Sequence, residues 1–275
     1  MSATLEWLGQ AGFIVRVGDD AVAIDPFLSD YPGRMYRAPR SPEELAGVDL
    51  VLVTHEHADH FDAPSLLRLL AVDHTARIVL ADPLLDRAVA LGFPLESLVG
   101  VQPGDQVNAG SIGIDVVPAL HGVRVTDAYT FGLPTDGAAS RYVGYVLRTP
   151  GGTVYHSGDT LTFAGQAARL RELGVDVALL PINGRDPQRE AQDIVGNLTP
   201  GEAVRLARAA RIATIVPMHY ECMANNLGDL ESFLALCREE PEPRPAVLDL
   251  AQAVEIASLV ANTAAPTAIV EGLAS

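Results

Sequence analysis

The string HEHADH at positions 55–60 holds four potential metal ligands within six residues. It directly follows an apolar run at 48–54 that is typical of a buried strand. In an extended backbone, residues two apart point to the same side, so His55 and His57 can bind one metal ion. Asp59 and His60 come after the bend that must follow and can face a second ion nearby. We interpret the string as a metal site, because incidental histidines on a solvated loop would not need this spacing.

The HxHxDH pattern resembles the signature of the metallo-β-lactamase superfamily. That resemblance implies an α/β (α+β) fold, the αβ/βα four-layer sandwich, in which two mixed β-sheets are flanked by helices. It also implies further ligands at the ends of later strands, and two divalent cations, either zinc or manganese, with iron as an alternative. The implied ligands are His55, His57 and His121 for one cation, Asp59, His60 and His219 for the other, and Asp159 as a bridge between them.

The same resemblance implies a hydrolase in which a hydroxide bridging the two metals attacks the substrate. Asp159 would orient this nucleophile and carry its proton to the leaving group. Asp59 would help to hold the cation that receives the developing charge. Asp59 and Asp159 are therefore the predicted catalytic residues.

Four strings in the second half of the chain resemble the L-ascorbate-6-phosphate lactonase group of this superfamily. They are YHSGDT (155–160), PINGRD (181–186), IVGNLTPGEA (194–203) and VPMHYECMANN (216–226). The resemblance predicts a small, anionic ester or lactone as substrate. A phosphodiesterase of the superfamily would share the ligands and differ only in its pocket. An iron-dependent oxidoreductase is a further alternative, although its diiron kind typically has a carboxylate where this chain has His57.

Asn183, Arg185 and Tyr220 are the predicted substrate-binding residues, because they follow buried strands at the edge where the site should open. Arg185 can clamp a phosphate or carboxylate, or else pair with a nearby acid and shape its loop. Tyr220 can donate a hydrogen bond to a developing oxyanion, or pack. His156 can support the metal site or belong to the core. The weaker candidates are Arg34, Tyr36, Arg37 and Arg189.

The elements that must position these residues alternate between strands and helices. The first half has strand-like runs at 5–8, 12–17, 21–25 and 48–54, with an irregular stretch at 26–42 and another at 122–141. The second half has predicted strands at 142–148, 153–156, 175–181, 212–217 and 246–250, and predicted helices at 162–173, 199–210 and 229–239. No linker divides the chain, so we predict a single domain at 1–262 and a frayed tail at 263–275.

The charge of the 275-residue chain limits its partners. It contains 19 basic and 35 acidic residues, for a net charge of −16, and every basic residue is an arginine. The absence of lysine excludes Schiff-base, pyridoxal-phosphate and P-loop chemistry. The acidic balance disfavours nucleic acid and anionic membranes, which leaves a small-molecule substrate as the expected partner. The sequence shows no evident signal peptide or membrane-spanning segment, so we predict a cytoplasmic location and no membrane insertion. A homo-oligomer is compatible with the sequence.

Overall fold

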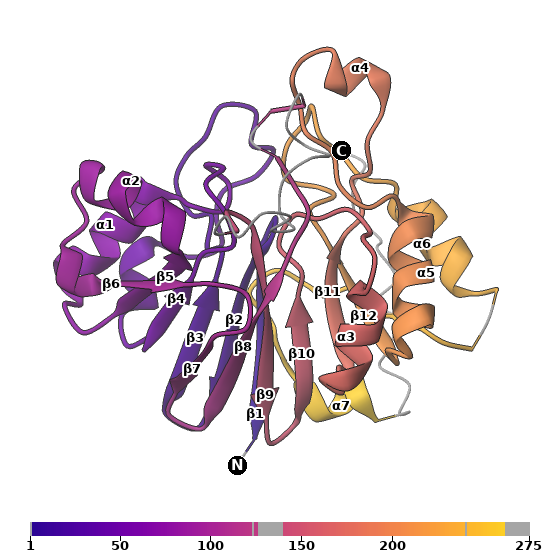
Figure 1. Cartoon of the computed structure of the whole chain (residues 1–275), viewed down its shortest axis with the longest axis horizontal. Coiled ribbons are helices and arrows are strands. Elements are labelled where there is room, and N and C mark those ends of the chain that lie inside the picture. The colour runs from indigo at the N-terminus through magenta and orange to yellow at the C-terminus, as the bar shows by residue number, and fades with distance from the viewer. Residues whose placement is uncertain (1, 123, 126–139, 240, 262–275) are drawn as a thin grey trace.

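The computed structural model describes residues 2–122, 124–125, 140–239 and 241–261. Two seven-stranded sheets form its centre (Figure 1). The strand order is β14-β1-β2-β3-β4-β5-β6 in the first sheet and β13-β12-β11-β10-β9-β8-β7 in the second. Among the described residues, no helix combines the length and the apolar character needed to cross a membrane.

The first sheet is built mainly from the N-terminal part of the chain. Antiparallel pairing joins β1 to β2 and β2 to β3, and parallel pairing then joins β3, β4, β5 and β6 in turn. Its strands are β1 (Ala3–Gly9), β2 (Gly12–Val17), β3 (Asp20–Ile24), β4 (Leu50–Leu52), β5 (Arg77–Ala81), β6 (Leu98–Val101) and β14 (Ala253–Glu255). Its helices are α1 (Ala63–Val72) and α2 (Leu85–Ala90), with 3₁₀ turns at Pro42–Leu45, Asp82–Leu84 and Leu95–Ser97.

The second sheet begins with an antiparallel arm and continues with parallel strands. Its strands are β7 (Gln106–Ala109), β8 (Ile112–Pro118), β9 (Val143–Thr149), β10 (Gly152–His156), β11 (Val177–Pro181), β12 (Thr214–Met218) and β13 (Arg244–Pro245). The helices that follow are α3 (Gln166–Glu172), α4 (Pro187–Glu190), α5 (Pro200–Ala210), α6 (Leu230–Cys237) and α7 (Ile256–Val260).

Two apolar cores explain the layers. One contains side chains of both sheets, such as Phe13 and Tyr145, and fills the space between them. The other packs the second sheet against α3, α5 and α6 through residues such as Leu170, Val204 and Phe233. In Figure 1, α1 and α2 lie outside the first sheet, and α3, α5 and α6 lie outside the second. The four-layer sandwich implied by the sequence resemblance is confirmed.

The strand predicted at 246–250 is wrong. The chain instead pairs at Arg244–Pro245 with β12 of the second sheet and at Ala253–Glu255 with β1 of the first sheet. Residues 246–252 therefore cross from one sheet to the other and cannot stay in a single ladder. The sequence prediction also missed β6 and α7, both of them short. Most of the stretch at 122–141 and the predicted tail at 263–275 lie outside the described residues.

Candidate metal centre

All seven predicted ligands follow strand ends at one edge of the two sheets. The string at 55–60 follows β4, His121 follows β8, Asp159 follows β10 and His219 follows β12. These turns bring residues far apart in sequence together. Their ligand atoms form two clusters, each with all atoms within 4.8 Å of one another.

The first cluster consists of His55, His57, His121 and Asp159. His55 Nε2 lies 2.9 Å from His57 Nδ1, and His121 Nε2 lies 3.3 Å from the same atom. His121 Nε2 is also 3.5 Å from Asp159 Oδ2. Three ring nitrogens and one carboxylate oxygen therefore face a common point, which is the donor set expected for a zinc-type or manganese-type cation.

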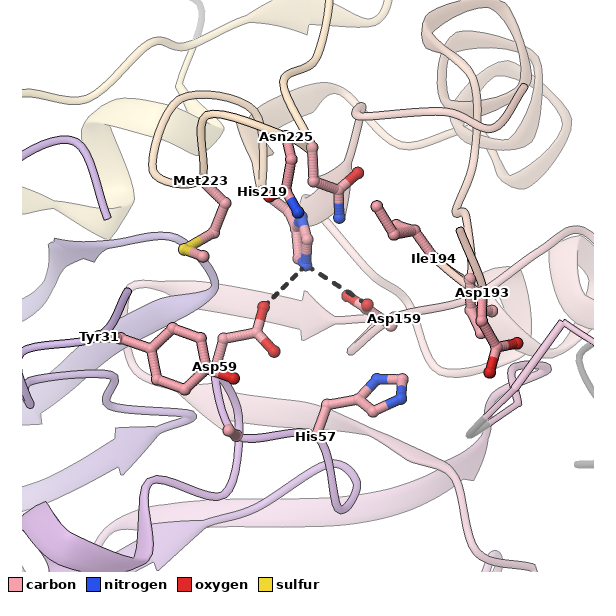
Figure 2. Close-up of a pocket in the computed structure, with 12 residues that line it drawn as sticks. Tyr31, His57, Asp59, Asp159, Asp193, Ile194, His219, Met223 and Asn225 are labelled. Atoms are coloured by element: carbon pink, nitrogen blue, oxygen red, sulfur yellow. Dashed lines mark ion pairs between the residues drawn. The ribbon is translucent and has the colours of Figure 1, made fainter. Parts of the chain in front are cut away.

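The second cluster consists of Asp59, His60 and His219. His219 Nε2 lies 3.2 Å from Asp59 Oδ2 and 3.4 Å from Asp159 Oδ2 (Figure 2). His60 Nε2 lies 3.2 Å from Asp159 Oδ1, yet neither of these buried atoms has a hydrogen-bond partner among the residues that the structure describes. Buried donors and acceptors that converge in this way fit the binding of a cation, and Asp159 contacts both clusters.

The pKa values of two histidines in each cluster are shifted, in opposite directions in the two clusters. Burial lowers the pKa of His55 well below its usual value and that of His121 to about 3, so these imidazoles are neutral. Burial would also lower the pKa of His219, but the nearby carboxylates of Asp159 and Asp59 outweigh it and raise that pKa to about 10. The pKa of His60 is raised for the same reason, with Asp25 contributing. Cation binding at the second cluster must therefore displace protons.

Asp25 is a buried support that the sequence analysis missed. Its Oδ2 lies 2.7 Å from His60 Nδ1 and accepts a 2.6 Å hydrogen bond from the Thr54 hydroxyl. Since that hydroxyl donates to Asp25, its oxygen can accept from Nδ1 of His55, 3.1 Å away. Both histidines are thereby oriented with Nε2 toward the clusters. The available signal was a carboxylate directly after a buried strand, in the string IDPF at 24–27.

His156 lies behind Asp159 and joins the two sheets. It is fully buried, its Nε2 donates to the carbonyl of Ala11 over 2.8 Å, and its Nδ1 accepts from the backbone of Gly158. Gly158 has φ +58°, and a Cβ there would lie 2.8 Å from Cβ of Thr54. The turn into Asp159 is therefore held by His156 and requires glycine, so His156 supports the centre from within the core.

Gln10, also missed, contacts the second cluster directly. Its amide nitrogen donates to Asp59 Oδ2 over 2.7 Å and lies 3.1 Å from His219 Nε2. Gln10 is buried and sits in the turn between β1 and β2. This contact holds the carboxylate of Asp59, whose backbone lies on the loop between β4 and α1.

The predicted substrate-binding residues lie outside the lining of the pocket beside the clusters. Arg185 makes two hydrogen bonds to Glu202, of 2.6 and 2.7 Å, and one to the carbonyl of Asn197. Tyr220 stacks on Trp7 with ring centroids 5.7 Å apart. Asn183 is buried and bonded to other amides. The structure thus gives these residues packing and loop-shaping contacts.

The weaker candidates are likewise held by the protein. Arg34 donates to the carbonyls of Phe27 and Tyr36, and its guanidinium lies over the Phe27 ring. Tyr36 donates to the carboxylate of Glu221. Arg37 is exposed and does not line the pocket.

The pocket over the two clusters has a volume of about 240 Å³. Ligands and loop residues line it together, and Figure 2 shows Tyr31 and Met223 on one side and Asp193 on the other. Its lining residues are Tyr31, His57, Ala58, Asp59, Asp159, Asp193, Ile194, Val195, His219, Met223, Asn225 and Asn226.

Comparison with known proteins agrees with this geometry. Residues 21–220 match the family model described as beta-lactamase superfamily domain. The chain is 32% identical to a UPF0173 metal-dependent hydrolase of Thermococcus kodakarensis, over 86% of this chain and 93% of that protein. It is 29% identical to the probable L-ascorbate-6-phosphate lactonase UlaG of Escherichia coli, over 71% of this chain and 55% of that protein.

Among solved structures, Igni18, a metallo hydrolase of Ignicoccus hospitalis, superposes with a TM-score of 0.69 at 25% identity. The match covers 92% of this chain and 98% of that one. The family match over residues 21–220 and the two His/Asp clusters lead to the same conclusion. The chain is a metal-dependent hydrolase that belongs to the metallo-β-lactamase superfamily.

Proposed function

We propose that this hydrolase uses two divalent cations, zinc or manganese, to cleave a small ester or lactone. The observation that carries the proposal is the pair of clusters that meet at Asp159. Iron also suits imidazole-rich ligands and stays an alternative metal. When bound, the two cations supply a water of lowered pKa and a Lewis acid for the reacting oxygen.

The side chains of the two clusters have distinct parts in this proposal. His55, His57 and His121 offer ring nitrogens to one cation, and Asp59, His60 and His219 hold the other. Asp159 lies between them, where its carboxylate can orient the attacking water and take its proton. Gln10 and Asp25 keep Asp59 and His60 in place.

The ester or lactone class rests on resemblance to the lactonase group, supported by the 29% identity to UlaG. The prediction of an anionic substrate depends on that resemblance and on arginines that could bind a phosphate or carboxylate. Arg185, the strongest of these, is bound to Glu202 and does not line the pocket. What supports an anion is the positive charge that two cations bring to the centre.

The experiment is a substrate panel on metal-loaded and chelator-treated protein, with uncharged lactones, 4-nitrophenyl esters and bis(4-nitrophenyl) phosphate. We expect metal-dependent cleavage of esters or lactones at the highest kcat/KM. The Asp59→Asn variant should lose it, whereas His74→Ala, which removes an exposed histidine outside the clusters, should not. Cleavage of the phosphodiester alone would favour a phosphodiesterase and overturn the proposal.

A further inference from the structure

Apart from the histidine ligands, no basic side chain lines the substrate pocket in the part of the chain that the structure describes. None of the 19 arginines of the chain lines it, and the sequence contains no lysine. The undescribed residues 126–139 contain two aspartates and no arginine by sequence. Among the described residues, no arginine or lysine adds a positive charge to the pocket, so an anionic group would find its cationic partner only at the metal-binding end.

Asn226 presents an amide whose orientation is fixed. Its Oδ1 accepts a 2.8 Å hydrogen bond from Arg189 Nη1 and a 2.9 Å bond from Asn183 Nδ2. A guanidinium can only donate. If the Asn226 amide were turned around, its NH₂ group would lie against two other donors, those of Arg189 and Asn183. Asn226 lines the pocket, so its Nδ2 group is left to donate there.

Arg189 acts from behind this wall and does not reach the pocket lining. It also donates to Asp186 over 2.5 Å and to the carbonyl of Asn183 over 2.8 Å. These bonds engage all three guanidinium nitrogens and hold the α4 segment against the Asn226 loop. An arginine that the sequence suggested for anion binding thus orients an uncharged donor.

The remaining lining disfavours an anion at the far end of the substrate. Asp193 is exposed at the rim, on the side opposite Tyr31 in Figure 2, and its carboxylate accepts from the backbone of Val125. Tyr31, Met223 and Ile194 supply apolar surface. A carboxylate or phosphate placed here would lose water without gaining a cationic partner.

We propose that the pocket selects a substrate whose non-reacting end carries no negative charge and whose carbonyl oxygen accepts a hydrogen bond from Asn226 Nδ2. The inference rests on the proposed ester or lactone hydrolysis, in which water adds across the acyl C–O bond to give an acid and an alcohol. Asn226 is then the residue that recognises the acyl group, and Asp193 the residue that repels anions.

A pair of esters of equal acyl length tests the charge preference. 4-Nitrophenyl butyrate is uncharged, whereas 4-nitrophenyl hydrogen succinate ends in a carboxylate. With the metal-loaded protein at low ionic strength, we expect kcat/KM to be about tenfold higher for the butyrate ester. Asp193→Asn should reduce this ratio by about twofold, and added salt should reproduce that reduction in the wild type.

Two variants of Asn226 test the donor. Asn226→Ala should lower kcat/KM for the butyrate ester by about tenfold. Asn226→Asp keeps an acceptor for Arg189 and replaces the donor by a carboxylate oxygen, which also adds a negative charge. A loss for the uncharged butyrate ester in both variants therefore argues against collapse of the wall as the cause. Asn108→Ala, an exposed residue on β7, is the matched control. Thermal melting confirms that each variant is folded.

The outcomes distinguish failure of the proposed substrate preference from failure of the proposed hydrolysis. Preference for the succinate ester, or an unchanged charge ratio in Asp193→Asn, would overturn the selection of an uncharged end. Wild-type kcat/KM in both Asn226 variants would overturn the role of Asn226. Failure of the metal-loaded wild type to cleave either ester would instead contradict the proposed function itself.

Discussion

The pocket has two walls whose side chains are held in different ways. The ligand wall consists of His57, Asp59, Asp159 and His219, and the loop wall consists of Tyr31, Ile194, Met223 and Asn226. Residues of the ligand wall follow strand ends and are supported by buried side chains, such as Gln10 and His156. The loop wall comes from three separate loops that are tied to one another.

The ties of the loop wall are backbone pairs and arginines. Met35 donates its N–H to the carbonyl of Cys222, and Ala224 donates to that of Gly33. Arg189 links Asn226 to the α4 segment. Because the ligand wall contains the predicted metal ligands, its loss should remove the reaction, whereas changes in the loop wall should alter its rate and selectivity.

The largest effect is expected for Asp59→Ala. Asp59 belongs to the second cluster and lies on a loop, half-buried. Its loss should therefore weaken cation binding without opening a cavity in the core. We expect kcat/KM to fall at least about a thousandfold with the melting temperature nearly unchanged. Steady-state kinetics with metal content measured on the same sample provides the check. Wild-type turnover would remove Asp59 from the mechanism.

A smaller effect is expected for Asp25→Asn, which removes the charge that orients His60 and keeps the shape. Loss of such an outer partner typically lowers metal affinity about tenfold to a hundredfold. Competition with a chromogenic chelator measures that affinity. Asp20→Asn is a matched control, because Asp20 bonds Ser111 far from the clusters. Equal affinities in wild type and Asp25→Asn would contradict the support assigned to Asp25.

For the loop wall, Arg189→Ala should lower kcat/KM by about tenfold through the released Asn226 amide. Metal content should stay that of the wild type, since Arg189 contacts no ligand. Kinetics and elemental analysis on one preparation separate the two walls. A loss of metal in this variant would show that the walls are not independent.

The smallest effect is expected for the ion pair between Arg185 and Glu202. It lies in the first turn of α5 and outside the pocket lining. The hydrogen bonds from Arg185 lower the pKa of Glu202 to about 2, against an ordinary value of 4.5. Because the folded pKa is the lower one, the stabilisation is full above pH 4.5 and is lost as the pH falls toward 2.

Glu202→Gln should therefore reduce the free energy of unfolding by about 1 kcal/mol at pH 7, a value discounted for solvent screening. The difference from wild type should shrink below pH 4.5. Urea denaturation at pH 7 and pH 3 measures both. Arg185→Ala should behave alike at pH 7, with kcat/KM changed less than twofold. A pH-independent difference would mean that the ion pair is not its source.

The sequence could predict the ligand wall because strand ends fix where a side chain emerges. HEHADH, His121, Asp159 and His219 each follow an apolar run, and a local pattern was sufficient. The loop wall could not be predicted in this way. Asn226 is oriented by Arg189, 37 residues away along the chain, through a contact that only the fold creates. The crossing at 246–252 likewise depends on which sheet offers a free edge.

Arg185 shows the same limit from the other side. Its position after a buried strand suggested a substrate clamp, but Glu202 lies within reach only once α5 packs beside β11. An arginine near an opening is therefore weak evidence of anion binding until its acceptors are known. Asp25, in contrast, could have been found, since it is a carboxylate directly after a strand in a metal-binding fold.

The central claim is that the two clusters each hold one divalent cation, and metal stoichiometry tests it most directly. Metal-free protein would be titrated with Zn²⁺ or Mn²⁺, freed of excess metal and analysed for bound ions per chain. We expect about two ions in the wild type and about one in His219→Ala, which loses a ligand of the second cluster only. Saturation of the wild type at one ion, or two ions in both proteins, would contradict it.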